Sequence, residues 1–202
     1  CTHGFTYGGS DGTGSNTNVI DKFPFASQTP ATDWADAVKA QYAGAGCSSD
    51  TYGYALGGTL LNGTTIKSIE RYPFATQTNG TEVGEITVAR HTAAGVSSLT
   101  HGYACGGLFA PFNFSDIIDR VSFASDAPVS DHGDLIDPIA HPSASSSTTH
   151  GYVCGGTLVS VPGTGNSTIS NVIQKFAYAS NITASDVGDL IIAADGMSGH
   201  QY

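Results

Sequence analysis

Hydrophobic and polar positions repeat along this chain with a fixed period. A polar turn leads into a short apolar strand that stops at a glycine pair, as in Thr-His-Gly-Tyr-Ala-Cys-Gly-Gly at residues 100–107. The same pattern stands at 2–9, 51–58 and 149–156, and its first glycines lie 49 residues apart each time. A period of this length is the mark of a repeat architecture, so the sequence predicts four copies of one structural unit.

Each unit continues with a segment in which apolar and polar residues alternate, rich in aromatic and β-branched types. This alternation is typical of a strand with one buried and one solvated face. The four aromatic segments are residues 19–26, 68–75, 117–124 and 172–179. Pro24 and Pro73 fall late in two of them, where a missing backbone donor is tolerated near a strand end.

Two further segments complete the unit, one acidic and one built from small residues. The acidic segments are residues 33–37, 82–86, 131–135 and 186–190, and the small-residue segments are 43–49, 92–98 and 142–147. Charge suits the outer edge of a sheet, whereas Gly and Ala allow backbones to crowd together at an axis. The pattern of each unit therefore predicts four strands, in the order small inner strand, glycine-pair strand, aromatic strand and acidic outer strand. Four strands in this order are typical of a propeller blade.

The chain is predicted to be one all-β domain, residues 1–202, with repeats at approximately 1–49, 50–98, 99–147 and 148–202. The fourth repeat carries six extra residues in the loop around 161–166. Aligning the tail without gaps places Gly199 on Gly95 and Tyr202 on Ser98. The C-terminus would then supply an inner strand to the N-terminal blade, and we expect a four-bladed propeller closed by that pairing.

Composition narrows the class of partner. Charged residues make up 12% of the chain, and its formal charge is -10 with seven Lys and Arg. Such a chain is not attracted to a nucleic-acid backbone or an anionic membrane surface. Because no apolar run approaches the ~20 residues that span a bilayer, membrane insertion is not expected either.

The cysteines are predicted to be free thiols. Cys105 and Cys154 occupy the same position in neighbouring repeats, which separates them by a whole structural unit. Free, buried thiols are therefore favoured over disulfides. The alternative left for Cys1 is that it is the lipidated first residue of a lipoprotein.

No residue of the chain stands out as catalytic or metal-binding. His3, His101 and His150 share one repeat position, which Tyr52 fills in the remaining copy, so a turn histidine is favoured over a metal ring. The acidic residues recur in every unit instead of gathering in one place, and neither a nucleophile elbow nor a phosphate-binding loop occurs. We predict no enzyme, no catalytic residue, no metal site and no cofactor; the ligand-binding residues stay unassigned.

The repeat resembles a kelch blade. The resemblance rests on the glycine pair that ends the second strand, the aromatic third strand, and the Ala-Arg-His step at 89–91 that leads into the inner strand. It implies a β-propeller of kelch-like four-stranded blades. Some kelch propellers, such as galactose-oxidase-like enzymes, are metal-dependent, and this keeps a metal-dependent enzyme as one alternative.

The unit also resembles the tandem repeats of marine bacteriophage virion and tail-fibre proteins, in its T-H-G-Y-x-x-G-G, F-x-F-A-S and D-x-G-D-L motifs. That resemblance implies an extracellular or virion-surface location. The expected function is a structural or adhesion module whose propeller loops bind a receptor glycan or a neighbouring protein. The alternative is a self-assembling filament or decoration protein, a homo-oligomer without a small ligand.

Five Asn-x-Ser/Thr sequons leave a second source for the protein as an alternative to a bacteriophage. They lie at Asn62, Asn79, Asn113, Asn166 and Asn181, in predicted loops. Glycans on surface loops would fit a secreted eukaryotic or algal-virus surface protein.

Overall fold

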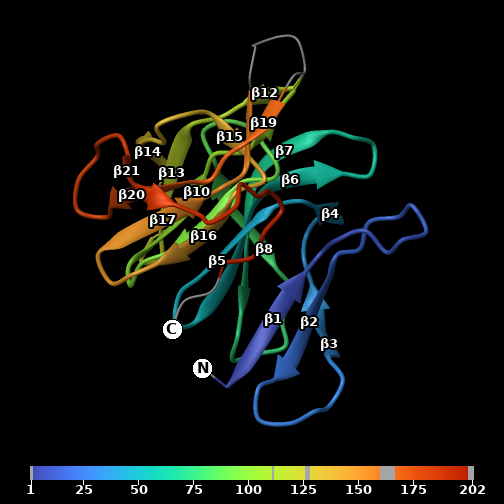
Figure 1. Ribbon diagram of the computed structural model, residues 1–202. Helices are drawn as coiled ribbons and strands as arrows, with labels where there is room; N and C mark the ends of the chain where they lie inside the picture. Colours follow the sequence, from blue (N-terminus) through green and yellow to red (C-terminus); the bar gives the residue numbers. More distant parts are fainter. Residues whose placement is uncertain (1, 111, 126–127, 160–166, 200–202) are drawn as a thin grey trace.

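The protein is all-β. The computed structural model describes residues 2–110, 112–125, 128–159 and 167–199 (Figure 1). The regular structure of these residues consists of antiparallel β-strands, which confirms the predicted fold class. Among them there is no helix with the length and apolar character needed to cross a membrane.

The repeated strands form four antiparallel sheets, numbered sheet 1 to sheet 4 in chain order, and the inner strand of each of sheets 2 to 4 comes from the end of the preceding repeat. Sheet 1 contains β1 (His3–Tyr7), β2 (Val19–Pro24) and β3 (Thr32–Asp36). Sheet 2 contains β5 (Ala45–Ser48), β6 (Tyr52–Leu60), β7 (Thr65–Pro73) and β8 (Thr81–Glu85). Sheet 3 contains β9 (Ala94–Ser97), β10 (His101–Cys105), β13 (Ile117–Ser122) and β14 (Ser130–Asp134). Sheet 4 contains β16 (Ser143–Ser146), β17 (His150–Cys154), β20 (Val172–Ala177) and β21 (Ser185–Asp189).

Sheets 2, 3 and 4 have the predicted strand order of inner, glycine-pair, aromatic and outer strand. Sheet 1 lacks an inner strand in the described part of the chain. Short strands that the sequence pattern did not predict continue several sheets past their glycine pairs. They are β4 (Gln41–Tyr42), β11 (Leu108–Phe109), β12 (Asn113–Phe114), β15 (Ile139–Ala140), β18 (Thr157–Val159) and β19 (Ser167–Ile169).

The glycine pairs recur because both members adopt backbone angles that other residues avoid. In sheet 2, Gly57 has a φ of 62° and Gly58 a φ of 120°, and all four pairs share this left-handed geometry. The turn brings the Gly58 amide to the carbonyl of Arg90, where it donates a hydrogen bond of 3.0 Å. The glycine-pair strand is thereby tied to the connection that leads into the next sheet.

The inner strands crowd together, as their small residues predict. β5, β9 and β16 lie side by side, and a Cβ atom on Gly95 would stand 1.9 Å from the carbonyl oxygen of Gly46. A Cβ on Gly199 would meet the oxygen of Ala144 at 1.8 Å, so residue 199 continues the same stack. Glycine is needed here for close backbone approach.

A ladder of backbone hydrogen bonds links the repeats beside this stack. The Thr92 amide donates to Ala43 (2.7 Å), His141 to Thr92 (3.1 Å), and Gly196 to His141 (3.0 Å). All four residues have a positive φ, between 54° and 62°. The residue types differ, so it is the repeated backbone path that places them in this conformation.

The core lies between consecutive sheets in three apolar clusters. At each junction an aromatic ring of the glycine-pair strand stacks on a ring that follows the aromatic strand of the next sheet. Ring centroids are 4.7 Å apart for Phe5 and Phe74, and 5.0 Å apart for Tyr54 and Phe123. The third stack, between Tyr103 and Tyr178, also measures 5.0 Å.

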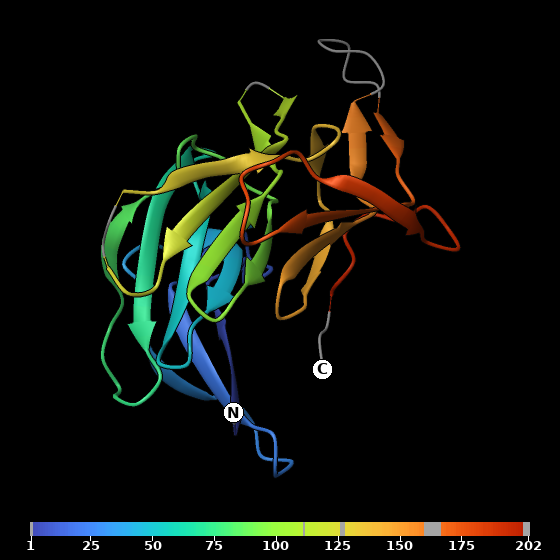
Figure 2. The same ribbon diagram turned by 90° about the vertical axis from the view of Figure 1, so that its left-hand side faces the viewer.

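Sheets 1 and 4 lie at the two ends of the series, and their strands are apart in both views (Figures 1 and 2). Through Gly199, no described segment pairs with the second side of β1. Residues 200–202, which complete the predicted C-terminal inner strand, lie outside the described residues, as does the six-residue insertion at 161–166. Closure of four blades by that strand therefore stays a prediction.

Candidate functional site

The junctions between sheets share a polar contact that recurs with the repeat. After each outer strand, a backbone amide donates to the side chain at the centre of the next aromatic strand. Val38 donates to Glu70 (2.7 Å), Thr87 to Asp119 (3.1 Å), and Ile136 to Gln174 (2.6 Å). The acceptors are 1%, 0% and 2% exposed, so each contact satisfies a buried polar group across a junction.

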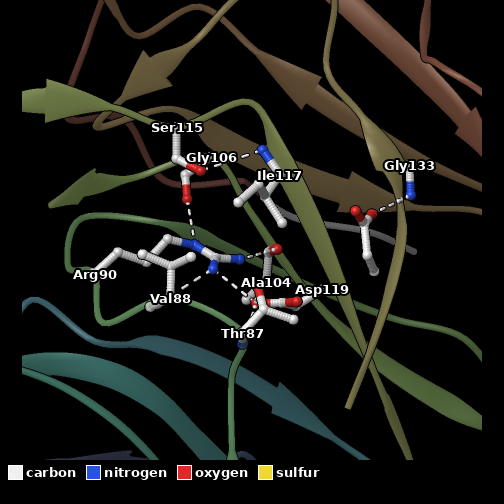
Figure 3. Close-up of polar contacts among 10 residues, drawn as sticks. Thr87, Val88, Arg90, Ala104, Gly106, Ser115, Ile117, Asp119 and Gly133 are labelled. Atoms are coloured by element: carbon white, nitrogen blue, oxygen red, sulfur yellow. Dashed lines mark hydrogen bonds and ion pairs between the residues drawn. The ribbon is translucent and has the colours of Figure 1, made fainter.

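The junction between sheets 2 and 3 adds a buried ion pair (Figure 3). Arg90 Nη1 lies 2.7 Å from Asp119 Oδ2, and both side chains are fully buried. The remaining guanidinium donors reach the carbonyls of Gly106 at 2.8 Å and Ala104 at 3.0 Å. The Thr87 hydroxyl donates to the same Asp119 oxygen at 3.1 Å. This network fixes the connection of sheet 2 onto sheet 3, which is a structural role.

A groove lies on the inner side of sheet 1, where sheets 2 to 4 carry their inner strands. Its volume is about 850 Å³, and its walls include Phe5 and Tyr7 of β1 and Gly46 and Cys47 of β5. At the other junctions the inner strand fills this space. The Cys47 sulfur stands 2.2 Å from the Cβ position of Gly102, and Val96 Cγ1 stands 3.0 Å from that of Gly151.

The groove is suited to packing and backbone pairing. The Tyr7 hydroxyl donates to the carbonyl of Ala45 at 3.0 Å, and burial raises the pKa of Tyr7 above its usual value. Burial also raises the pKa of Tyr72 to about 12 and the pKa of Cys47 to about 12. Because these groups are neutral at physiological pH, Cys47 is not a nucleophile there. The exposed side of β1 offers backbone donors and acceptors to an added strand.

Comparison with known proteins addresses the fold. The chain is similar in fold to YjhT. The solved structure of YjhT superposes with a TM-score of 0.81 at 13% sequence identity, over 98% of this chain and 70% of that chain. No protein-family model matches the sequence, and no curated protein matches it. The four sheets are thus arranged as in the matching part of YjhT. The remainder of YjhT lies outside the match.

The repeated histidines lie at strand starts beside the turns. The Nδ1 atoms of His101 and His150 each lie 2.8 Å from the hydroxyl of the preceding threonine, and His3 has the same contact at 2.9 Å. The backbone amides of His101 and His150 donate hydrogen bonds to the hydroxyls of Ser98 and Ser147, each at 3.0 Å. Among the described residues, no three His, Cys, Asp or Glu side chains are grouped as metal ligands would be.

The thiols that the structure describes are free. Cys47 and Cys105 are buried, as predicted, whereas Cys154 is free but only half-buried. Burial raises the pKa of each thiol, so they act as small apolar side chains. Cys1, with its lipidation alternative, lies outside the described residues.

His132 is a buried histidine that the sequence pattern left unplaced. It is 2% exposed, its Nε2 lies 2.9 Å from the Ala177 carbonyl across the junction between sheets 3 and 4, and its ring packs at 5.2 Å from that of Tyr103. Within the described residues Nδ1 has no partner, so a proton added there would bury an unpaired charge. Burial accordingly lowers the pKa of His132.

The free energy of unfolding is therefore expected to decrease as the pH is lowered below 7, the range in which histidines bind protons. The unfolded chain binds a proton at its ordinary pKa of about 6.5, whereas folded His132 binds one only at lower pH. The free energy of unfolding should decrease as pH falls from 7 through the lowered pKa. Urea unfolding at pH 7.0 and 5.5 measures this, and His132→Gln should reduce the difference. An unchanged difference in the variant would show that other groups cause it.

Proposed function

We propose that the four sheets are consecutive blades of a kelch-like β-propeller that serves as a non-enzymatic adhesion or structural module on a cell or virion surface. The resemblance of the repeat to kelch and phage virion repeats supports the proposal, and so do the strand order of sheets 2 to 4 and the fold similarity to YjhT. The junctions are dominated by packing and structural hydrogen bonds. Function is then carried by exposed loops.

One observation supports a binding surface more directly than any other. The connections between glycine-pair and aromatic strands extend as hairpins from the same end of the sheets, seen for β11–β12, β18–β19 and the long β6–β7 pair (Figure 1). They expose large apolar side chains: Leu61 is 62% exposed, Phe112 79% and Ile169 50%. Exposed apolar residues gathered on loops are typical of a contact surface.

The sequons support a location outside the cytoplasm. Asn62, Asn79, Asn113 and Asn181 are all exposed, so each is accessible to a glycosylating enzyme. Asn62 and Asn113 lie on the hairpins themselves, and glycans there would border the proposed contact surface. Asn166 lies outside the described residues.

The proposal is tested with a panel of immobilised cell-surface glycans. We expect the protein to bind at least one glycan class, and the double variant Leu61→Ser/Phe112→Ser to weaken that binding about tenfold or more, since few anchors carry most of a contact's energy. The matched control is Ile182→Ser, which removes a 61% exposed side chain from the β20–β21 connection at the other end of sheet 4. An absence of binding to the whole panel, or equal losses in variant and control, would contradict glycan recognition by these hairpins.

A further inference from the structure

The three junctions inside the chain obey one rule, which leaves two unmatched faces. A ring of the glycine-pair strand stacks on the next sheet, an amide after the outer strand binds the next aromatic strand, and the axial ladder passes one hydrogen bond onward. Every contact points from one sheet to the following one. Sheet 4 therefore presents the first half of a junction, and sheet 1 presents the second half.

The face of sheet 4 leaves its contact groups more exposed than their counterparts inside the chain. Ile191 takes the repeat position of Val38, Thr87 and Ile136, and Tyr152 that of Phe5, Tyr54 and Tyr103. Ile191 is fully exposed, against 49% for Val38 and 42% for Ile136. Tyr152 is half-buried, whereas Tyr54 and Tyr103 are 2% and 1% exposed. All five residues of β21 are exposed, whereas β3 and β14 each bury at least one residue under the following sheet.

The face of sheet 1 carries the complementary groups. Asp21 takes the repeat position of Glu70, Asp119 and Gln174, the acceptors of the outer-strand amides. Phe25 takes the position of Phe74, Phe123 and Tyr178, but it is 62% exposed, whereas these three are half-buried. Beside it lie the groove and the side of β1 that faces away from β2, along which no described strand pairs.

The two faces are apart in the part of the chain that the structure describes. Figures 1 and 2 show sheets 1 and 4 apart, with β21 and β1 on different sides of the arrangement. The match covers 70% of YjhT, so that protein has structure beyond the part that these four sheets match. The faces are thus placed to continue the series of junctions with another unit of the same kind.

We propose that copies of this chain associate head to tail, with the sheet-4 face of one copy docking on the sheet-1 face of the next. Ile191 and Tyr152 of one copy would contact Asp21 and Phe25 of the other, as their counterparts do inside the chain. Residues 197–199, of which Gly199 packs on Ala144 in the axial stack, would point toward the groove beside β1 of the next copy. A contact of this heterologous kind builds a ring or a filament. The proposal goes beyond glycan binding and does not depend on it.

The test is sedimentation of the full chain over a concentration series, with one charged substitution on each face. The wild-type protein should associate as its concentration rises. Ile191→Glu and Phe25→Glu should each weaken association about tenfold or more. Leu61→Glu is the matched control, because Leu61 has the same 62% exposure as Phe25 but lies on a hairpin tip, and it should associate as the wild type does.

Mixing the two variants separates head-to-tail association from other modes. A copy with Ile191→Glu keeps a sound sheet-1 face, and a copy with Phe25→Glu keeps a sound sheet-4 face. Each variant alone should be monomeric, while the equimolar mixture should form a dimer that does not grow further. The proposal is overturned if the wild type stays monomeric throughout, if both variants associate like the wild type, or if the mixture stays monomeric. Glycan binding by the hairpins would be unaffected by any of these results.

Discussion

Replacing Arg90 by methionine is expected to lower the free energy of unfolding by about 3–5 kcal/mol, the usual cost of removing one partner from a buried ion pair. Asp119 would keep its hydrogen bonds from Thr87 but lose the guanidinium that pairs with it. The carbonyls of Ala104 and Gly106 would lose their guanidinium donors as well. Urea unfolding followed by fluorescence measures the loss.

Two comparisons isolate the buried charge as the cause. Lys67→Met breaks an exposed ion pair with Glu85, whose side chains are 48% and 53% exposed, and should cost no more than about 1 kcal/mol. Adding Asp119→Leu to Arg90→Met removes the stranded carboxylate and should restore part of the lost stability. A double variant less stable than Arg90→Met alone would show that packing, and not the unpaired charge, sets the cost.

Replacing Gly95 by valine should lower the free energy of unfolding by about 3 kcal/mol or more, because overpacking against backbone cannot be relieved by a side-chain rotation. The nearest atom to the new Cβ is the Gly46 carbonyl oxygen at 1.9 Å, so β5 and β9 would have to separate. Ala144, at the same position in sheet 4, shows that a methyl group is accommodated where the strands are spaced for it.

The control for this change is Gly84→Val in the outer strand β8. A Cβ at Gly84 meets its nearest neighbour, Ile69 Cδ1, at 3.9 Å, which is an ordinary contact. Its expected cost is less than about 1 kcal/mol, since valine suits a strand. Equal unfolding midpoints for the two variants would contradict the crowded inner stack.

Most of the sheet arrangement can be predicted from the 49-residue period of the sequence. The spacing of Gly4, Gly53, Gly102 and Gly151 located the sheets, and the residue types of each segment ordered the strands correctly, because burial on one face imposes alternation and crowding imposes small residues. The short strands beyond the glycine pairs were missed. Segments as short as Leu108–Phe109 carry no alternation that a pattern could detect.

The junction contacts were predictable only in part. A polar residue stands at the centre of every aromatic strand, as Glu70 and Asp119 do, and this recurrence is the sequence signal for the buried acceptors. Arg90 is part of the kelch resemblance, but its buried partner lies 29 residues away, and no local pattern links the two residues. The positive φ of Ala43, Thr92 and His141 cannot be predicted from the sequence, because three unrelated residue types adopt it.

The unpaired side of β1 in sheet 1 is the feature that favours contact with a second copy of the chain. β1 has the sequence of a central strand and packs Phe5 on Phe74 as its counterparts do, yet its inner side faces a groove. A strand with apolar, pairable backbone on one side is a template for another chain. Head-to-tail contact would remove that exposed edge and cover part of Ile191 and Tyr152 in the same step.

Thiol cross-linking between residue 21 and residue 191 tests the proposed contact most directly. Asp21→Cys and Ile191→Cys are made in separate copies, with Cys1 and Cys154 replaced by serine, and the mixture is treated with a short bismaleimide. We predict a cross-linked dimer from the mixture, little from either variant alone, and a ladder of multimers from the chain that carries both substitutions. A doubly substituted chain that cross-links only within the monomer would instead show closure of one copy upon itself, and no cross-link at all would contradict the shared junction.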